Sequence, residues 1–170
     1  IPNTSGINDT GSGTNGVVAW CWKGGGSSST YNIDGTGHTT ASAAGLDGGT
    51  IDPTGASINT VAGFSIIAYT GNGTAGATIA HGLGKKPAFW MWKSIDNTID
   101  WYNYHKDIGY NGWLNLSASS AATTGNDAAW GAEPTSTVLT HGSGLVNQNT
   151  IIMYVWAEIP GYSKFGTYTG

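Results

Sequence analysis

Short runs of β-branched and aromatic residues, each bounded by turn-forming residues, are the feature that most constrains the fold of this chain. Glycine accounts for 28 of the 170 residues, and no window keeps a 3.6-residue apolar period long enough for a long helix. Short strands separated by turn signals are typical of β-sandwiches, so we predict an all-β, antiparallel β-sandwich of jelly-roll-like form. The expected strands are 16–22, 64–70, 77–83, 88–94, 99–105, 112–117, 136–141, 150–159 and 162–168.

Side-chain alternation indicates which strands are covered on both faces. In 88–94, Trp90 and Met91 must point to opposite faces of a sheet, and both are apolar. In 150–159, Met153 and Tyr154 do the same. These two strands are therefore expected in the middle of the sheet.

The length of the chain fits one domain of ordinary size. We expect residues 1–15 to form a flexible tail or linker and residues 16–170 to form the sandwich domain. Within that domain, 24–61 is rich in Gly, Ser and Thr and indicates a long surface insertion. Five widely spaced apolar side chains are expected to anchor this insertion to the main body: Tyr31, Ile33, Leu46, Ile51 and Ile58.

Two similar stretches suggest an internal repeat. "GFSIIAYTG" occupies 63–71 and "GYSKFGTYTG" occupies 161–170, a spacing of 98 residues. We interpret 63–160 as a core repeat unit and 161–170 as the start of a second repeat or a closing strand. The chain begins at Ile1 without an initiating Met, so we expect it to be part of something longer or a processed product.

The charge composition disfavours several classes of partner. Only 9% of the residues are charged, the six basic residues are all Lys, and the net charge is −4. Nucleic-acid binding, which uses Arg and a basic face, is therefore not expected. No apolar run approaches the length of a membrane-spanning helix, so membrane insertion is not expected either. The single cysteine, Cys21, is expected to be a packed thiol.

Carboxylates are too sparse to predict catalysis. The densest group lies in "KSIDNTIDWYNYHKDIG", where Asp-Asn between apolar runs is better explained as a hairpin turn. Asp100 and Glu133 are the one carboxylate pair considered for glycoside hydrolysis, and nothing in their spacing selects them. The acidic and histidine side chains of the dense group named above are Asp96, Asp100, His105 and Asp107. We therefore expect a protein that is not an enzyme and that uses no cofactor.

Metal binding is also not expected. His81 and His141 each precede a Gly, and without ligand spacing they are better explained as residues at strand ends before turns. The 32–37 and 46–55 segments offer oxygen ligands that suit calcium, but neither follows the known loop pattern, and Asx-turns explain both. Whether the 32–55 loops bind calcium stays open.

Aromatic residues between 101 and 113 are the candidate site. Eight Trp and eight Tyr exceed what one small core needs. Flat rings near amides suit a glycan-binding surface, whereas the alternative is that they fill the core or a subunit interface. Neighbouring side chains on a strand face opposite sides, so one set is expected to be exposed. The candidates are Trp101, Tyr102, Tyr104, Tyr110 and Trp113.

Several motifs in order resemble an uncharacterised domain that often occurs in tandem in structural proteins of tailed bacteriophages, particularly marine ones. These are "VVAWCWK", "GFSIIAYTGNG", "HGLGKKPAFWMWK", "WYNYH", "LNLSASSAATT", "AWGAEPTSTVLT" and "YVWAEIPGYSKFGTYTG". The resemblance covers roughly residues 16–170. It implies a component of the virion surface, such as a tail or tail-fibre protein or a decoration protein.

Two functions follow as expectations. The first is a structural virion protein that assembles with copies of itself and with other virion proteins, because edge strands with little charge invite association. A trimer is favoured by analogy with phage fibres. The second is an adhesin domain that binds a receptor or host glycan through the candidate aromatics. A polysaccharide depolymerase is a weaker alternative.

Overall fold

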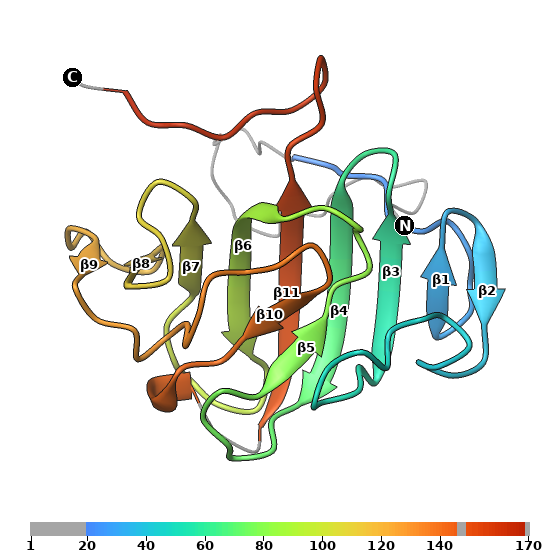
Figure 1. The fold of residues 1–170 in the computed structure, drawn as a ribbon, viewed down its shortest axis with the longest axis horizontal. Coiled ribbons are helices and arrows are strands. Elements are labelled where there is room, and N and C mark those ends of the chain that lie inside the picture. The colour runs from blue at the N-terminus through green and yellow to red at the C-terminus, as the bar shows by residue number, and fades with distance from the viewer. Residues whose placement is uncertain (1–19, 146–148, 169–170) are drawn as a thin grey trace, which may run out of the picture.

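The computed structural model describes residues 20–145 and 149–168 (Figure 1). The described chain is nearly all β, as predicted, with no α-helix and one short 3-10 helix, η1, at Ser143–Leu145. The strands are β1 (Tyr31–Ile33), β2 (Thr36–His38), β3 (Gly55–Asn59), β4 (Phe64–Thr70), β5 (Thr78–Ala80), β6 (Pro87–Ser94), β7 (Tyr102–His105), β8 (Gly112–Asn115), β9 (Thr123–Thr124), β10 (Val138–Thr140) and β11 (Thr150–Ala157).

Nine strands form one large sheet in the order β2-β1-β3-β4-β11-β6-β7-β8-β9. The antiparallel pair β5 and β10 forms a second, small sheet that lies across one face of the large one (Figure 1). The expectation of a purely antiparallel arrangement is wrong at one position, because β1 and β3 are parallel. β2 turns back along β1, and the 39–54 connection then returns the chain so that β3 runs in the direction of β1.

The predicted strands are most accurate in the middle of the sheet. β4 has the predicted bounds, and β6 and β11 lie within one or two residues of them. Both predicted central strands are interior, with β11 between β4 and β6. These strands are recognisable because apolar side chains cover both of their faces.

The predicted strand at 162–168 is not formed, and most of the predicted strand at 16–22 lies outside the described residues. Residues 16–19 and the predicted 1–15 tail lie outside the described residues, and 20–22 are irregular. Residues 162–168 contain only a bridge at Ser163, which closes a turn with Ile159. In both segments a bulky side chain rests on the sheet, and the backbone does not join it as a strand: Trp22 packs on Trp156, and Phe165 on Phe89.

The 24–61 segment is more than a surface insertion. It supplies β1, β2 and β3 to the large sheet. Its five predicted anchors all pack in or against the core, with Leu46 and Ile58 fully buried. Sequence analysis missed these strands because they are short and rich in Gly, Ser and Asn.

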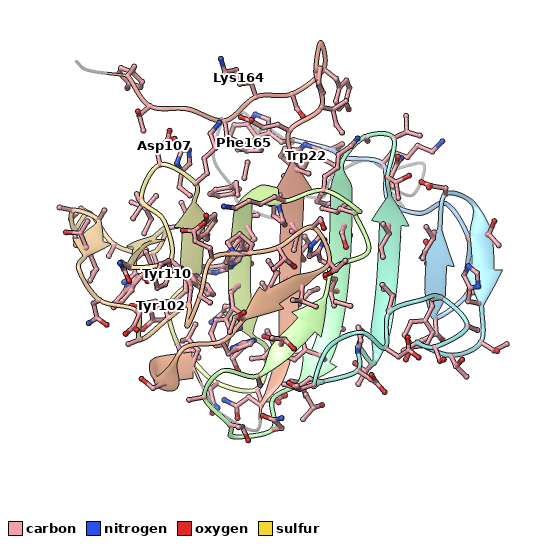
Figure 2. All side chains as sticks on the ribbon, in the orientation of Figure 1. Trp22, Tyr102, Asp107, Tyr110, Lys164 and Phe165 are labelled. Carbon is pink, nitrogen blue, oxygen red and sulfur yellow. The ribbon has the colours of Figure 1, made fainter. Side chains whose placement is uncertain are left out.

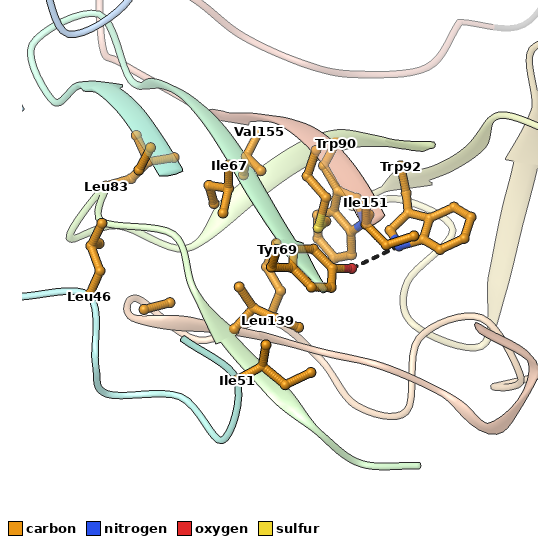
Figure 3. Close-up of a cluster of buried hydrophobic side chains, with 14 of the residues drawn as sticks. Leu46, Ile51, Ile67, Tyr69, Leu83, Trp90, Trp92, Leu139, Ile151 and Val155 are labelled. Carbon is orange, nitrogen blue, oxygen red and sulfur yellow. Dashed lines mark hydrogen bonds between the residues drawn. The ribbon is translucent and has the colours of Figure 1, made fainter. Parts of the chain in front are cut away.

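The main core lies between the large sheet and the layer that contains β5 and β10. Figure 3 shows Ile67 and Tyr69 of β4, with Trp90 and Trp92 of β6, on one side and Leu139 of β10 on the other. All five are at most 1% exposed. Burial of this many large side chains is the main stabilising contribution to the domain.

Candidate functional site

The face of the large sheet turned away from this core is only partly covered, and we call it the open face. Along β4, β6 and β11, side chains alternate between fully buried and half-buried. The buried set points to the core, so the half-buried set points to the open face. Its central members are Ile66, Ala68, Met91, Ile152 and Tyr154.

Both terminal segments of the described chain cover one end of the open face. Figure 2 shows Trp22 and Phe165 near the end of β11. The ring of Phe165 stacks on Phe89, with centroids 5.6 Å apart and planes 14° apart. Trp22 meets Trp156 edge-on at 5.3 Å. Elsewhere on the open face, Trp101 of the β6–β7 connection stacks on Tyr154, and the Gly25 backbone N–H donates to Ser57 Oγ of β3 at 2.8 Å.

Glu158 fixes the C-terminal segment to the end of the sheet. Its Oε1 accepts hydrogen bonds from the Phe165 backbone N–H at 2.8 Å and from Lys106 Nζ at 2.6 Å. The bonds from Lys106 and Phe165 hold the pKa of the Glu158 carboxyl below its usual value. The cover of this end is therefore attached by directed contacts.

The uncovered part of the open face contains a groove beside the β6–β7 connection. The groove has a volume of about 540 Å³, and Trp101, Ile152 and Tyr154 are among its lining residues. The rings of Trp101 and Tyr154 are nearly parallel, with centroids 6.5 Å apart. Leu116 and Ile95 lie at its margins, and they are 61% and 63% exposed. The rest of the groove lining is polar or charged and consists of Lys93, Ser94, Asp96, Asn97 and Thr98.

Charge is nearly absent from the centre of the open face. Of the open-face positions on β4, β6 and β11, only Lys93 is charged. Its ammonium group donates hydrogen bonds to the backbone carbonyls of Asn97 and Ile99 in the β6–β7 connection. The central strands therefore present a mostly apolar surface, and charged side chains, Lys93 and Asp96, line the groove at its margin.

The sheet separates the five candidate aromatics. Tyr104 is fully buried on the core side, where its ring stacks on Trp90 at 3.8 Å. Tyr102 pairs in register with Trp92, also on the core side, and contacts Trp113 at 6.0 Å. Only Trp101 of the five lines the groove on the open face.

Tyr110 also lies on the core side, near Tyr102 and beside β7 and β8 (Figure 2). Its ring is half-buried against the core, and its backbone N–H donates to Glu133 Oε1 at 3.0 Å. Sequence analysis missed Ile152 and Tyr154 as site residues, although the apolar alternation of 150–159 placed one apolar set on each face. The alternation does not reveal which of the two faces is covered by the second layer of the structure.

The two carboxylates considered for hydrolysis lie in separate hydrogen-bond networks. Glu133 accepts from Lys86 Nζ at 2.7 Å and from the Tyr104 hydroxyl at 3.2 Å. Burial opposes ionisation of Glu133, but these bonds and the one from Tyr110 lower its pKa overall. Asp100 instead accepts from Ser117 Oγ at 2.8 Å.

The remaining members of the acidic group stabilise turns. An Asp96 carboxylate oxygen accepts the Thr150 backbone N–H at 2.5 Å, which ties the β6–β7 turn to the start of β11 and lowers the pKa of Asp96. His105 Nδ1 accepts the Asp107 backbone N–H at 3.2 Å. These contacts agree with the turn interpretation of this segment.

His81 and His141 are buried and lie in separate hydrogen-bond networks. His81 Nδ1 accepts the Leu83 N–H at 3.2 Å, and its Nε2 lies 3.3 Å from the Thr135 carbonyl. His141 Nε2 lies 2.5 Å from the Tyr69 hydroxyl. Burial lowers the pKa of each imidazole to about 4.

Metal-ligand geometry is not found among the described residues, where no three His, Cys, Asp or Glu side chains form a group that could hold an ion. In the 32–55 region, the Asp34 carboxylate accepts the Thr60 backbone N–H at 2.8 Å.

The expectation that Cys21 is a packed thiol is wrong, because Cys21 is exposed and its neighbour Trp20 is 76% exposed. No helix in the described part is long and apolar enough to cross a membrane.

The edges of the large sheet are short. β2 has three residues and β9 has two, and most of their residues are exposed. Short edge strands are one way in which proteins prevent edge-to-edge pairing. The short edge strands therefore do not favour the expectation that sheet edges drive association.

Comparison with known proteins gives one match. A family model described as a domain of unknown function (DUF7483) matches residues 2–170. No curated protein matches the chain, and no solved structure matches it. The match includes the 24–61 segment, in keeping with the three strands that this segment adds to the sheet.

Proposed function

We propose that this chain, which belongs to the DUF7483 family of domains of unknown function, is a non-enzymatic structural protein of a bacteriophage virion. In this proposal it forms part of a tail, a tail fibre or a surface decoration and acts through self-assembly and subunit packing. The single observation that carries the assembly role is the open face, where apolar side chains of three central strands stay partly exposed.

The physical argument is the cost of leaving this surface in water. Apolar surface contributes about 25 cal/mol per Å² when it is buried. Ile66, Tyr154 and Met91 form one row across the open face, since Tyr154 of β11 pairs with Ile66 of β4 and with Met91 of β6. Packing a partner against them gains this energy, and the near absence of charge means that little desolvation opposes it.

We also propose a more detailed description of the fold, as a β-sandwich with two unequal layers. We treat β5, β10 and the loops around them as the short second layer of a β-sandwich whose first layer is the nine-stranded sheet. This unequal arrangement covers one face of the large sheet and leaves the other available for assembly. The virion location rests on the resemblance of the motifs between 16 and 170 to the tandem domains of phage structural proteins.

The proposal predicts association that depends on concentration. Size-exclusion chromatography with light scattering is expected to give a mass above the 17.5 kDa of one chain, rising with protein concentration. Mass spectrometry of purified phage particles is expected to detect the chain. A monomer at every concentration, together with particles that lack the chain, contradicts the proposal.

A second candidate function is glycan binding by an adhesin domain. The nearly parallel rings of Trp101 and Tyr154 favour it, because ring faces pack on sugar C–H groups. Ser117 and Asp100, which are hydrogen-bonded to each other near Trp101, offer polar groups for hydroxyls.

This alternative predicts a loss of glycan-array signal in Trp101→Ala that does not occur in Trp113→Ala. The two residues are close in sequence, but Trp113 lies on the other face of the sheet, where it contacts Tyr102. The comparison therefore tests the groove and not the general loss of an indole. Equal signals in the wild type and both variants contradict glycan binding.

A further inference from the structure

Two Asn-Gly pairs in the described chain lie in very different surroundings, Asn72–Gly73 in a turn and Asn111–Gly112 at the start of a strand. A third pair, Asn15–Gly16, lies outside the described residues. Asn-Gly favours deamidation because glycine has no side chain to hinder attack by its own backbone nitrogen. We infer that Asn72 is a site of spontaneous covalent modification, at which the folded protein converts asparagine to aspartate and isoaspartate.

The reaction at Asn72 needs only water. The Gly73 backbone nitrogen gives up its proton to the solvent and forms a bond to the side-chain carbonyl carbon of Asn72. The bond from that carbon to the amide nitrogen breaks, and the nitrogen takes up a proton and leaves as ammonia. Water then opens the resulting succinimide ring at one of its two carbonyls. One opening gives aspartate, and the other gives isoaspartate, in which the main chain runs through the side chain. No atom is oxidised or reduced.

The turn between β4 and β5 presents Asn72 for this reaction (Figure 1). Asn72 and Gly73 are both exposed, and Gly73 has a φ of +75°, a conformation that glycine adopts without strain. The Thr74 backbone N–H donates to Asn72 Oδ1 at 3.0 Å. This bond turns the side chain toward the backbone that follows it and polarises the carbonyl that is attacked. Exposure, an unhindered neighbour and a positioned side chain therefore coincide at Asn72.

The second pair is protected by the strand that it begins. Asn111 is exposed, but Gly112 is buried as the first residue of β8 and pairs with Thr124 of β9. The Asn111 carbonyl accepts the Asn126 N–H at 2.8 Å, and a side-chain carbon at Gly112 would overlap the Thr123 carbonyl. Ring closure rotates the backbone at this peptide, so β8 must first open. Even about 1.4 kcal/mol of opening free energy slows the reaction about tenfold.

The modified turn connects the two sheets of the fold. β4 belongs to the large sheet and β5 to the small one. Hydrogen bonds hold both ends of the turn, from the Gly71 N–H to the Asn149 carbonyl at 3.0 Å and from the Gly76 N–H to the His141 carbonyl at 2.9 Å. Isoaspartate adds a carbon to the main chain between these bonds and a negative charge to the surface. The modification therefore alters the connection between the sheets without cleaving the chain.

Peptide mapping of the folded protein over time tests the inference. The purified chain is kept in a mildly alkaline buffer, and each Asn-Gly pair is followed by mass spectrometry and by labelling with isoaspartyl methyltransferase. We expect conversion at Asn72 to be at least about tenfold faster than at Asn111. In urea, where the chain is unfolded, we expect similar rates at both residues.

Asn72→Gln is the matched variant, because it keeps the amide, while its longer side chain disfavours ring closure. It is expected to lose the fast conversion at position 72 and to leave the slow conversion at Asn111 unchanged, with circular dichroism confirming the fold. Equal rates at Asn72 and Asn111 in the folded protein, or a faster rate at Asn111, overturn the inference. An Asn72 that stays intact in the folded protein while the unfolded chain converts overturns it as well.

Discussion

Replacing Trp90 with Ala is expected to lower the free energy of unfolding by about 3–5 kcal/mol, the usual cost of truncating a buried Trp. Trp90 is 1% exposed and packs between two aromatic partners. Its ring stacks on Tyr104 at 3.8 Å and meets Trp130 edge-on at 5.0 Å. The variant leaves a cavity that strands fixed in a sheet cannot close.

Urea denaturation measures this effect, and Trp101→Ala is the matched control. Trp101 is only partly buried, beside the groove, so its removal is expected to cost less than the removal of Trp90. The indole Nε1 of Trp90 has no hydrogen-bond partner, so no bond is lost on truncation. Similar losses in both variants would show that Trp90 is not central to the core.

The different positions of these two residues show what the sequence can and cannot predict. The alternation of 88–94 places Trp90 and Met91 on opposite faces, and the structure agrees. The alternation does not show which face the second layer covers, because that depends on where β5 and β10 pack. This long-range contact decides that Trp90 lies in the core and Met91 on the open face.

The similar stretches at 63–71 and 161–170 show a second limit of local sequence. Gly63 and Gly161 both have positive φ, +66° and +76°, so each stretch begins with the same kind of turn. After Gly63 the chain forms β4, which pairs with β3 and β11 on its two sides. After Gly161 the described residues pair with no strand, and Phe165 packs on the sheet instead. Similar local sequences therefore form a strand only where neighbouring strands are available to pair with them.

Acidification from pH 6.5 to pH 4 is expected to destabilise the domain through His81 and His141. Burial lowers the pKa of each to about 4 in the folded protein, whereas an unfolded His titrates near 6.5. Between these values the unfolded chain binds more protons than the folded protein. The contribution of the two neutral imidazoles to the free energy of unfolding is therefore fully present above pH 6.5 and decreases as the pH falls. Each His contributes a loss of about 3 kcal/mol over the window.

The hydrogen bonds explain why the folded state disfavours protonation. Trp92 Nε1 donates to the Tyr69 hydroxyl at 2.9 Å, and that hydroxyl lies 2.5 Å from His141 Nε2. With neutral His141 accepting at Nε2, the Tyr69 hydroxyl both accepts and donates. A proton on Nε2 would leave the Tyr69 hydrogen without an acceptor. In His81, a proton on Nδ1 would face the N–H of Leu83.

The slope of unfolding free energy against pH measures both residues. It is expected to approach 1.4 kcal/mol per pH unit for each His between pH 6 and 4.5, by the usual conversion. His141→Gln is expected to remove about half of the slope, at the cost of lower stability at pH 7. His38→Asn, on edge strand β2, is the control and should keep the full slope.

Measurements stay above pH 4.5 because Glu133 and Glu158, whose pKa values are lowered, lose their hydrogen bonds at more acidic pH. A stability that is constant from pH 6.5 to 4.5 would mean that neither imidazole is held neutral by the fold.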